Sequence, residues 1–140
     1  MSIKELSRNQ EHDLAVQTMY SFLMLEKTNQ VIDFKEIIKL VFEREYEETS
    51  VYIRELLLSS LKYQRIIIEE ISKYLKNRAF ERLNVCMQAI LILSYAEYYY
   101  MKDSDKAVVI NIAVKLAKKY GDGKDYKYIN AVLDNALNEK

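Results

Sequence analysis

Two neighbouring stretches near the C-terminus, INIAVKLAKKYG (residues 110–121) and KYINAVLD (residues 127–134), decide the fold of this 140-residue chain. In both stretches the apolar residues recur every three or four positions, which is the spacing of one face of an α-helix. Gly121 stands where a helix C-terminal glycine belongs, free to adopt a positive φ. The two stretches therefore predict two helices, over 105–120 and 125–138, joined by a short glycine turn.

The same apolar period runs through the rest of the chain and predicts four further helices. They cover residues 7–26, 33–42, 51–75 and 83–101. Ser7 and Gln10 have the spacing of a capping box at the first helix, and DSD (residues 103–105) is expected to cap the helix at 105–120. Residues 76–80 are expected to form a short break. Because proline is absent and only two glycines occur, the sequence predicts an all-α fold.

The charge of the chain is balanced, with 21 basic and 21 acidic residues. This balance removes the simplest electrostatic argument for nucleic-acid binding. The halves differ, however: residues 1–50 hold ten acids and six bases, whereas residues 51–140 hold 11 acids and 15 bases. A single cysteine and the lack of a long apolar run favour a cytoplasmic protein without a membrane span.

Signatures of catalysis are missing from the sequence. One histidine and one cysteine lie far apart, without a CxxC or HExxH motif, which argues against a zinc site. Two glycines in one loop cannot build a nucleotide-binding fingerprint. Paired carboxylates such as Glu69 and Glu70 point about 100° apart on a helix and do not converge on one atom. We therefore expect neither an enzyme nor a bound cofactor or metal.

Two features point to binding instead. The segment AEYYYM (residues 96–101) directs three successive tyrosines in three directions, so some should reach the surface or an interface, or else pack between helices with wet hydroxyls. The segment KLAKKYGDGKDYKYIN (residues 115–130) gathers lysines around a glycine turn and a helix N-terminus, where anions such as phosphate are favoured. The alternative for these lysines is a plain solvated surface, because Asp122 and Asp125 dilute their charge.

Read together, these segments resemble the NusB family of bacterial transcription antitermination factors. INIAVKLAKKYG followed by KYINAVLD is similar to the family's C-terminal motif, and LAVQTMY (residues 14–20) to its first helix. NRAFERLN (residues 77–84) and ILILSYAEY (residues 90–98) resemble two further family segments. The resemblance spans the whole chain. It implies one all-helical domain over 1–140, a bundle of about seven helices in two packed sub-bundles, about 1–77 and 78–140.

The resemblance also implies a function and its partners. NusB-like proteins pair with NusE, a small-subunit ribosomal protein, bind boxA RNA in ribosomal RNA transcripts, and help to load the antitermination complex onto RNA polymerase. On this reading we expect RNA contacts from the residues that follow the family pattern or carry charge near it: Arg8, Gln10, His12, Lys118, Lys119, Lys124 and Lys127. Candidates for contact with the protein partner are Tyr20, Met87 and Tyr98. Asn111, Asn130 and Glu97, which are set among apolar neighbours, are expected to have structural roles.

The chain departs from the family where RNA contacts are expected. The arginine-rich lead-in to the first helix is reduced to Arg8, and a family tryptophan is missing. Ile92 and Ile112 stand where relatives carry an arginine and a glutamate, and Ala131 replaces a glycine. The alternative reading is therefore a protein-interaction module, such as a homodimer, in which Ile92 and Ile112 build an apolar contact surface. The resemblance also implies a third reading, an RNA methyltransferase, in which this fold is only an N-terminal domain; without a catalytic domain in these 140 residues, we do not expect that activity.

Overall fold

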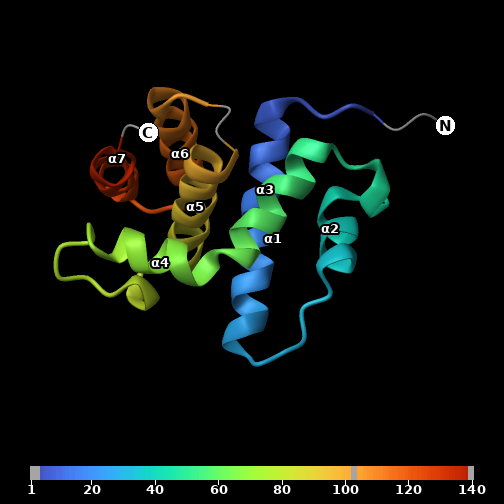
Figure 1. Ribbon diagram of the computed structural model, residues 1–140, viewed down its shortest axis with the longest axis horizontal. Coiled ribbons are helices and arrows are strands. Elements are labelled where there is room, and N and C mark those ends of the chain that lie inside the picture. Colours follow the sequence, from blue (N-terminus) through green and yellow to red (C-terminus); the bar gives the residue numbers. More distant parts are fainter. Residues whose placement is uncertain (1–3, 102–103, 139–140) are drawn as a thin grey trace.

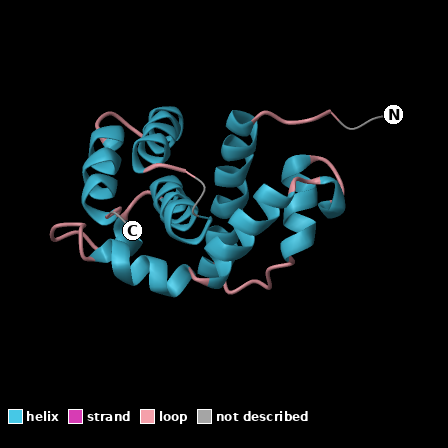
Figure 2. Cartoon of the chain, turned by 45° about the horizontal axis from the view of Figure 1, so that its top comes forward, coloured by secondary structure: helices cyan, strands magenta, loops and turns pink. Residues whose placement is uncertain are grey.

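The computed structural model describes residues 4–101 and 104–138, and these residues form seven α-helices and no strand (Figures 1 and 2). The helices are α1 (Arg8–Lys27), α2 (Phe34–Phe42), α3 (Val51–Lys62), α4 (Gln64–Ser72), α5 (Val85–Ala96), α6 (Lys106–Tyr120) and α7 (Asp125–Ala136). Two 3-10 turns, η1 (Tyr46–Glu48) and η2 (Phe80–Arg82), and a π-helical turn, η3 (Glu97–Met101), complete the described elements. The prediction of an all-α fold is confirmed. Over the described ranges, no helix is long and apolar enough to cross a membrane.

Local sequence sets where the helices begin. The Ser7–Gln10 capping box forms as predicted: the Gln10 N–H donates to Ser7 Oγ (3.1 Å), and the Ser7 N–H donates to Gln10 Oε1 (2.8 Å). At α6, the observed N-cap differs from the predicted cap by DSD (residues 103–105). Asp103 lies outside the described residues, and Asp105 occupies the N-cap without a side-chain cap bond.

Gly121 ends α6 for a reason other than the predicted one. Its φ of −101° and ψ of −176° are extended backbone, and the positive φ belongs to Gly123 instead, at +47°. Gly121 is required because of space: a Cβ atom there would lie 2.7 Å from the Ala117 carbonyl oxygen. The missing side chain thus allows α7 to follow α6 closely.

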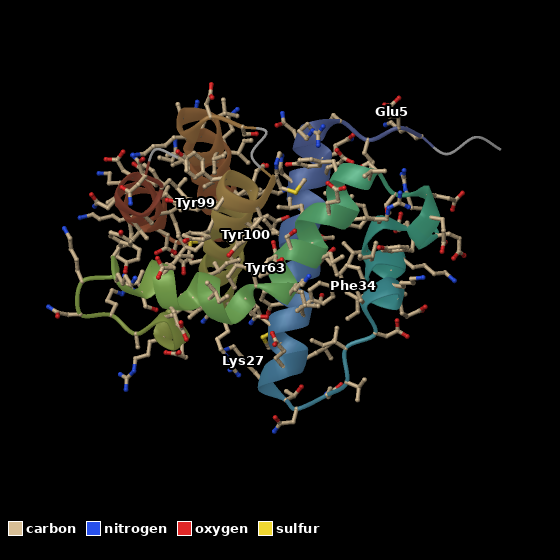
Figure 3. All side chains as sticks on the ribbon, viewed as in Figure 1. Glu5, Lys27, Phe34, Tyr63, Tyr99 and Tyr100 are labelled. Carbon is tan, nitrogen blue, oxygen red and sulfur yellow. The ribbon has the colours of Figure 1, made fainter. Side chains whose placement is uncertain are left out.

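The helix predicted over 51–75 is in fact two helices, which meet at Tyr63. The backbone leaves helical geometry at Tyr63 (φ −102°, ψ 14°), and the chain changes direction into α4. The Tyr63 ring stacks on Tyr100 of η3, with ring centroids 4.4 Å apart and an interplanar angle of 11° (Figure 3). Beyond the bend, α4 packs on α5 and α7.

Helix α5 lies at the centre of the molecule (Figure 1). Every residue from Met87 to Tyr98, through α5 and into η3, is buried. This helix has no single inward face, because α1, α3, α4, α6 and α7 all pack against it. The fully buried Ile92 belongs to this core and cannot build the apolar contact surface of the alternative reading.

The division into sub-bundles near residue 78 remains a prediction. In Figure 1, α1, α2 and α3 lie on one side of the molecule, and α4 lies with α5, α6 and α7 on the other. Since α4 packs on α5 and α7, we propose that the boundary lies at Tyr63 rather than near residue 78.

Candidate nucleic-acid interface

A groove between α1 and α6 holds the first group of candidate residues. It has a volume of about 230 Å³ and is lined by Asn9, His12, Asp13, Ile112, Lys115, Leu116 and Lys119. The Lys119 ammonium and the Tyr120 hydroxyl both donate to the Asp13 carboxylate, and Gln17 Nε2 donates to the Tyr120 hydroxyl at 3.2 Å. These bonds fix the C-terminal end of α6 against α1.

The electrostatics of this groove follow from the Lys119–Asp13 contact. Partial burial alone would raise the pKa of Asp13, but the hydrogen bonds from Lys119 and Tyr120 outweigh it and lower the pKa. The same hydrogen bond raises the pKa of the exposed Lys119 ammonium. Lys119 therefore faces the groove as a cation whose charge is partly neutralised by Asp13.

Arg8 and Gln10 stand at the start of α1. The Arg8 side chain is 55% exposed, its guanidinium lies 3.5 Å from the centroid of the Tyr52 ring, and it approaches Glu11 at 3.7 Å. Gln10 is exposed, but its Oε1 accepts the Ser7 N–H and thereby serves the helix start. Of these two residues, Arg8 carries the positive charge that suits a phosphate, although Glu11 lies close to it.

His12 is buried, which corrects the expectation that it faces RNA from a polar surface. It is 7% exposed, and its Nε2 lies 2.8 Å from Glu97 Oε1 and 2.8 Å from the Tyr52 hydroxyl. The Tyr52 hydroxyl also donates to Glu97, at 2.7 Å from Oε1. His12 therefore joins α1 to α3 and η3. The helical spacing of His12, Ala15 and Met19 already places it on the apolar face of α1.

Glu97 accepts the hydrogen bonds of this buried network from both His12 and Tyr52. This position agrees with the structural role predicted for it. Burial would raise its pKa, but hydrogen bonds from His12 and Tyr52, together with the charge of Arg8, lower it overall. For Tyr52, burial and the neighbouring Glu97 carboxylate raise the pKa. Glu97 therefore remains ionised at neutral pH and holds the start of α1 in place. Asn111 and Asn130, by contrast, are exposed, so burial does not assign them a structural role.

The turn between α6 and α7 holds the second group, Lys118, Lys124 and Lys127. All three are exposed. Lys118 Nζ lies 4.9 Å from the centroid of the Tyr126 ring, and Lys127 Nζ lies 6.0 Å from the same centroid. The structure thus places Lys118 and Lys127 beside one tyrosine, and Lys124 at the N-cap of α7.

The three candidates for the protein partner differ in exposure. Met87 and Tyr98 are only 3% and 5% exposed, so their side chains are not available to a partner, which corrects that expectation. Tyr20 is 38% exposed and lines a groove of about 380 Å³ together with Val41 of α2 and Cys86 of α5. Only Tyr20 remains a candidate for contact.

Both the sequence and the fold of this chain are similar to those of known proteins. The sequence profile of the NusB family matches residues 9–138. Transcription antitermination protein NusB of Methylacidiphilum infernorum (isolate V4) is 31% identical over 137 residues, which cover 96% of this chain and 92% of the relative. The structure of T. maritima NusB matches with a TM-score of 0.81 at 21% identity, over 96% of this chain and 92% of that one. The crystal structure of antitermination factors NusB and NusE in complex with dsRNA matches with a TM-score of 0.77 at 24% identity, over 93% and 95%. The chain therefore belongs to the NusB family.

Proposed function

We propose that this protein is a transcription antitermination factor that binds boxA RNA in ribosomal RNA transcripts together with NusE. The observation that carries the proposal is the 31% identity to an antitermination protein over 96% of the chain. The protein acts as an adaptor in the cytoplasm, without catalysis or a cofactor, and reaches RNA polymerase through the assembled complex. Its function consists of binding RNA and NusE and of positioning them relative to each other.

The geometry supports RNA contacts at the start of α1 and on α6. Arg8 provides a guanidinium, and Lys119 and the exposed Lys115 provide ammonium groups along the α1–α6 groove. Such groups contact phosphates and set the register of the RNA, while unstacked bases give sequence preference. His12 contributes by positioning α1 through Glu97 rather than by touching RNA.

NusE is proposed to cover the groove beside Tyr20. An exposed tyrosine at the edge of an apolar groove supplies a large contact area and a hydroxyl for a protein partner. Substitution of Tyr20 by alanine should weaken the NusE complex and leave the intrinsic RNA affinity of this protein unchanged. A second copy of this chain in the same groove is the competing occupant, and the molar mass of the protein in solution distinguishes the two.

The test is a titration of labelled boxA RNA with this protein, alone and with NusE, at two salt concentrations. We expect micromolar or tighter binding that weakens with salt and falls when the boxA sequence is scrambled. Arg8→Ala should weaken binding, whereas Lys62→Ala, which removes an exposed lysine of α3, should not. Absence of binding with NusE present would refute the proposal and leave a protein-interaction module as the remaining function.

A further inference from the structure

The side chain of Tyr52 lies between Arg8, a candidate RNA contact, and the buried Glu97. Tyr52 is the second residue of α3 and is half-buried. It is not among the residues that the sequence led us to expect in a binding role. The first turn of α3 lies beside the first turn of α1, although the two helices are far apart in the sequence (Figure 1). Tyr52 therefore connects an exposed cation to the protein interior.

The hydroxyl of Tyr52 is anchored inside the protein. It donates to Glu97 Oε1 at 2.7 Å, and His12 Nε2 lies 2.8 Å from it. The His12 ring also meets the Tyr52 ring edge to face, with ring centroids 5.8 Å apart and an interplanar angle of 80°. Because His12 and Glu97 are both buried, water does not compete for these contacts. They fix the orientation of the Tyr52 ring.

The face of this ring carries the Arg8 guanidinium. The guanidinium carbon lies 3.5 Å from the ring centroid, which is the distance of direct contact between a cation and a π face. The same guanidinium lies 3.7 Å from Glu11 Oε1, and Glu11 in turn accepts the hydrogen bond of the Ser50 hydroxyl at the N-cap of α3. The start of α3 thus supplies or fixes both neighbours of the Arg8 side chain.

A guanidinium held in this way can still bind a phosphate. Stacking uses its flat face, whereas its five N–H donors lie in the plane and point outward from the edges. The Arg8 side chain is 55% exposed, so edges that do not face Glu11 reach solvent. Two parallel N–H donors of one edge match the oxygens of a phosphate. The ring therefore orients the guanidinium without using its donors.

Order in the unbound protein matters for affinity. A long, exposed side chain loses its rotamer freedom when it binds a ligand, and this loss weakens binding about two- to tenfold. A side chain that is already held in place loses less freedom on binding. The contact with the Tyr52 ring should therefore increase the affinity that Arg8 contributes.

We propose that Tyr52 is a positioning residue for RNA binding, and that its ring holds the Arg8 guanidinium in the orientation that meets a phosphate. The inference rests on the proposed function and deepens it, because it assigns part of the RNA affinity to a residue that does not touch the RNA. Tyr52 acts through Arg8. Its effect on affinity should therefore vanish when Arg8 is replaced.

The experiment measures binding of labelled boxA RNA, with NusE present, at several salt concentrations. Tyr52→Leu removes the ring, and Tyr52→Phe keeps the ring but removes the hydroxyl; Tyr52→Leu is also combined with Arg8→Ala. Tyr46→Leu is the matched control, because the Tyr46 ring carries Lys35, at 5.1 Å from Nζ to the centroid, rather than a proposed RNA contact.

Two further measurements are made on each variant without RNA. Thermal unfolding reports the stability of the fold. Proton NMR reports the placement of Arg8, because an adjacent aromatic ring shifts the signals of the Arg8 δ-methylene protons upfield.

Tyr52→Leu should weaken RNA binding about fivefold and leave the salt slope unchanged, because the charge of Arg8 remains. Arg8→Ala should also make the slope shallower by about 0.7, and adding Tyr52→Leu to it should weaken binding no further. Tyr52→Phe should lower the melting temperature, because the hydrogen bonds of the hydroxyl are lost, but keep the RNA affinity and the shift of the Arg8 protons. Tyr46→Leu should bind RNA as the wild type does.

Several results would overturn the inference. An equal loss of affinity in Tyr52→Phe and Tyr52→Leu would assign the effect to the buried hydrogen bonds instead of the ring. Additive losses in the double variant, an equal loss in Tyr46→Leu, or an Arg8 proton shift that persists in Tyr52→Leu would also contradict it. Unchanged binding by Arg8→Ala would remove Arg8 from the RNA site while the proposed function stands.

The inference stays testable if one arm of the experiment fails. If Tyr52→Leu does not fold, Arg8→Lys tests the contact from its exposed side, because an ammonium has no plane to stack on the ring. Arg8→Lys should then bind RNA more weakly, and full affinity would refute the positioning role. If the wild type does not bind boxA RNA, the proposed function falls, and the Arg8 proton shift in the Tyr52 variants still decides whether the ring holds the guanidinium.

Discussion

Replacement of Asp13 by asparagine should increase RNA affinity. The Asp13 carboxylate accepts hydrogen bonds from the Lys119 ammonium and the Tyr120 hydroxyl in the α1–α6 groove. Asparagine keeps an oxygen that can accept from Tyr120 but removes the negative charge beside Lys119. The substitution thus frees one cation without emptying the groove.

The size of the gain follows from the counting of phosphate contacts. One additional cation that reaches a single-stranded phosphate makes the slope of log K against log salt steeper by about 0.7, which corresponds to about fivefold tighter binding at about 0.1 M salt. The cost in stability should stay below about 1 kcal/mol, because the Lys119 and Asp13 side chains are 57% and 27% exposed and solvent screens their pairing.

The assay is fluorescence anisotropy of labelled boxA RNA at four or more salt concentrations, with thermal unfolding measured alongside. Asp134→Asn is the control, since it frees Lys106 from a similar ion pair at the opposite end of α6, about 20 Å from Lys119. Unchanged affinity and slope in Asp13→Asn would show that Lys119 does not contact RNA. An equal gain in Asp134→Asn would show that only net charge matters.

Three further predictions concern stability. Glu97→Ala leaves the buried donors of His12 and Tyr52 without their acceptor, so unfolding should be easier by about 3 kcal/mol and the melting temperature, followed by circular dichroism, lower by about 10 °C. The folded-state pKa of Glu97 lies below its unfolded value, so its ionisation stabilises the protein above about pH 4.5, and this stabilisation is lost as the pH falls. The urea midpoint of the wild type should therefore fall in acid more steeply than that of Glu97→Gln. Gly121→Ala would place Cβ 2.7 Å from the Ala117 carbonyl oxygen, so we expect a loss of about 1–3 kcal/mol in urea unfolding.

Each of these predictions has a result that contradicts it. A wild-type melting temperature for Glu97→Ala would mean that the buried network contributes nothing to the fold. Parallel acid titrations of wild type and Glu97→Gln would assign the acid sensitivity to another group. An unchanged urea midpoint for Gly121→Ala would mean that the α6–α7 turn relaxes freely, with Gly123→Ala, which changes a positive-φ glycine in open space, as the comparison.

The helices were largely predictable because their signals are local. Apolar spacing and the Ser7 cap placed α1 to within a residue or two of its observed bounds, and α6 and α7 followed in the same way. The bend at Tyr63 was missed because no glycine or proline marks it. The bend is accompanied by stacking on the ring of Tyr100, which lies far away in sequence and meets Tyr63 only in the folded chain.

The candidate site was predictable only where charge alone decides exposure. Lys118, Lys124 and Lys127 are exposed, and Lys118 and Lys127 both lie beside the Tyr126 ring, as the lysine-rich segment suggested. His12 was misplaced because its polarity was weighed above its position on the apolar face of α1.

The burial of α5 on all sides has a consequence for how the molecule unfolds. Since α1, α3, α4, α6 and α7 all pack on it, neither half of the chain can open without exposing its apolar surface. The amide protons of Val85–Ala96 should therefore exchange with solvent only when the whole protein unfolds. Any ligand held at α1 then protects α7 equally, because a single cooperative transition links both ends of the bundle.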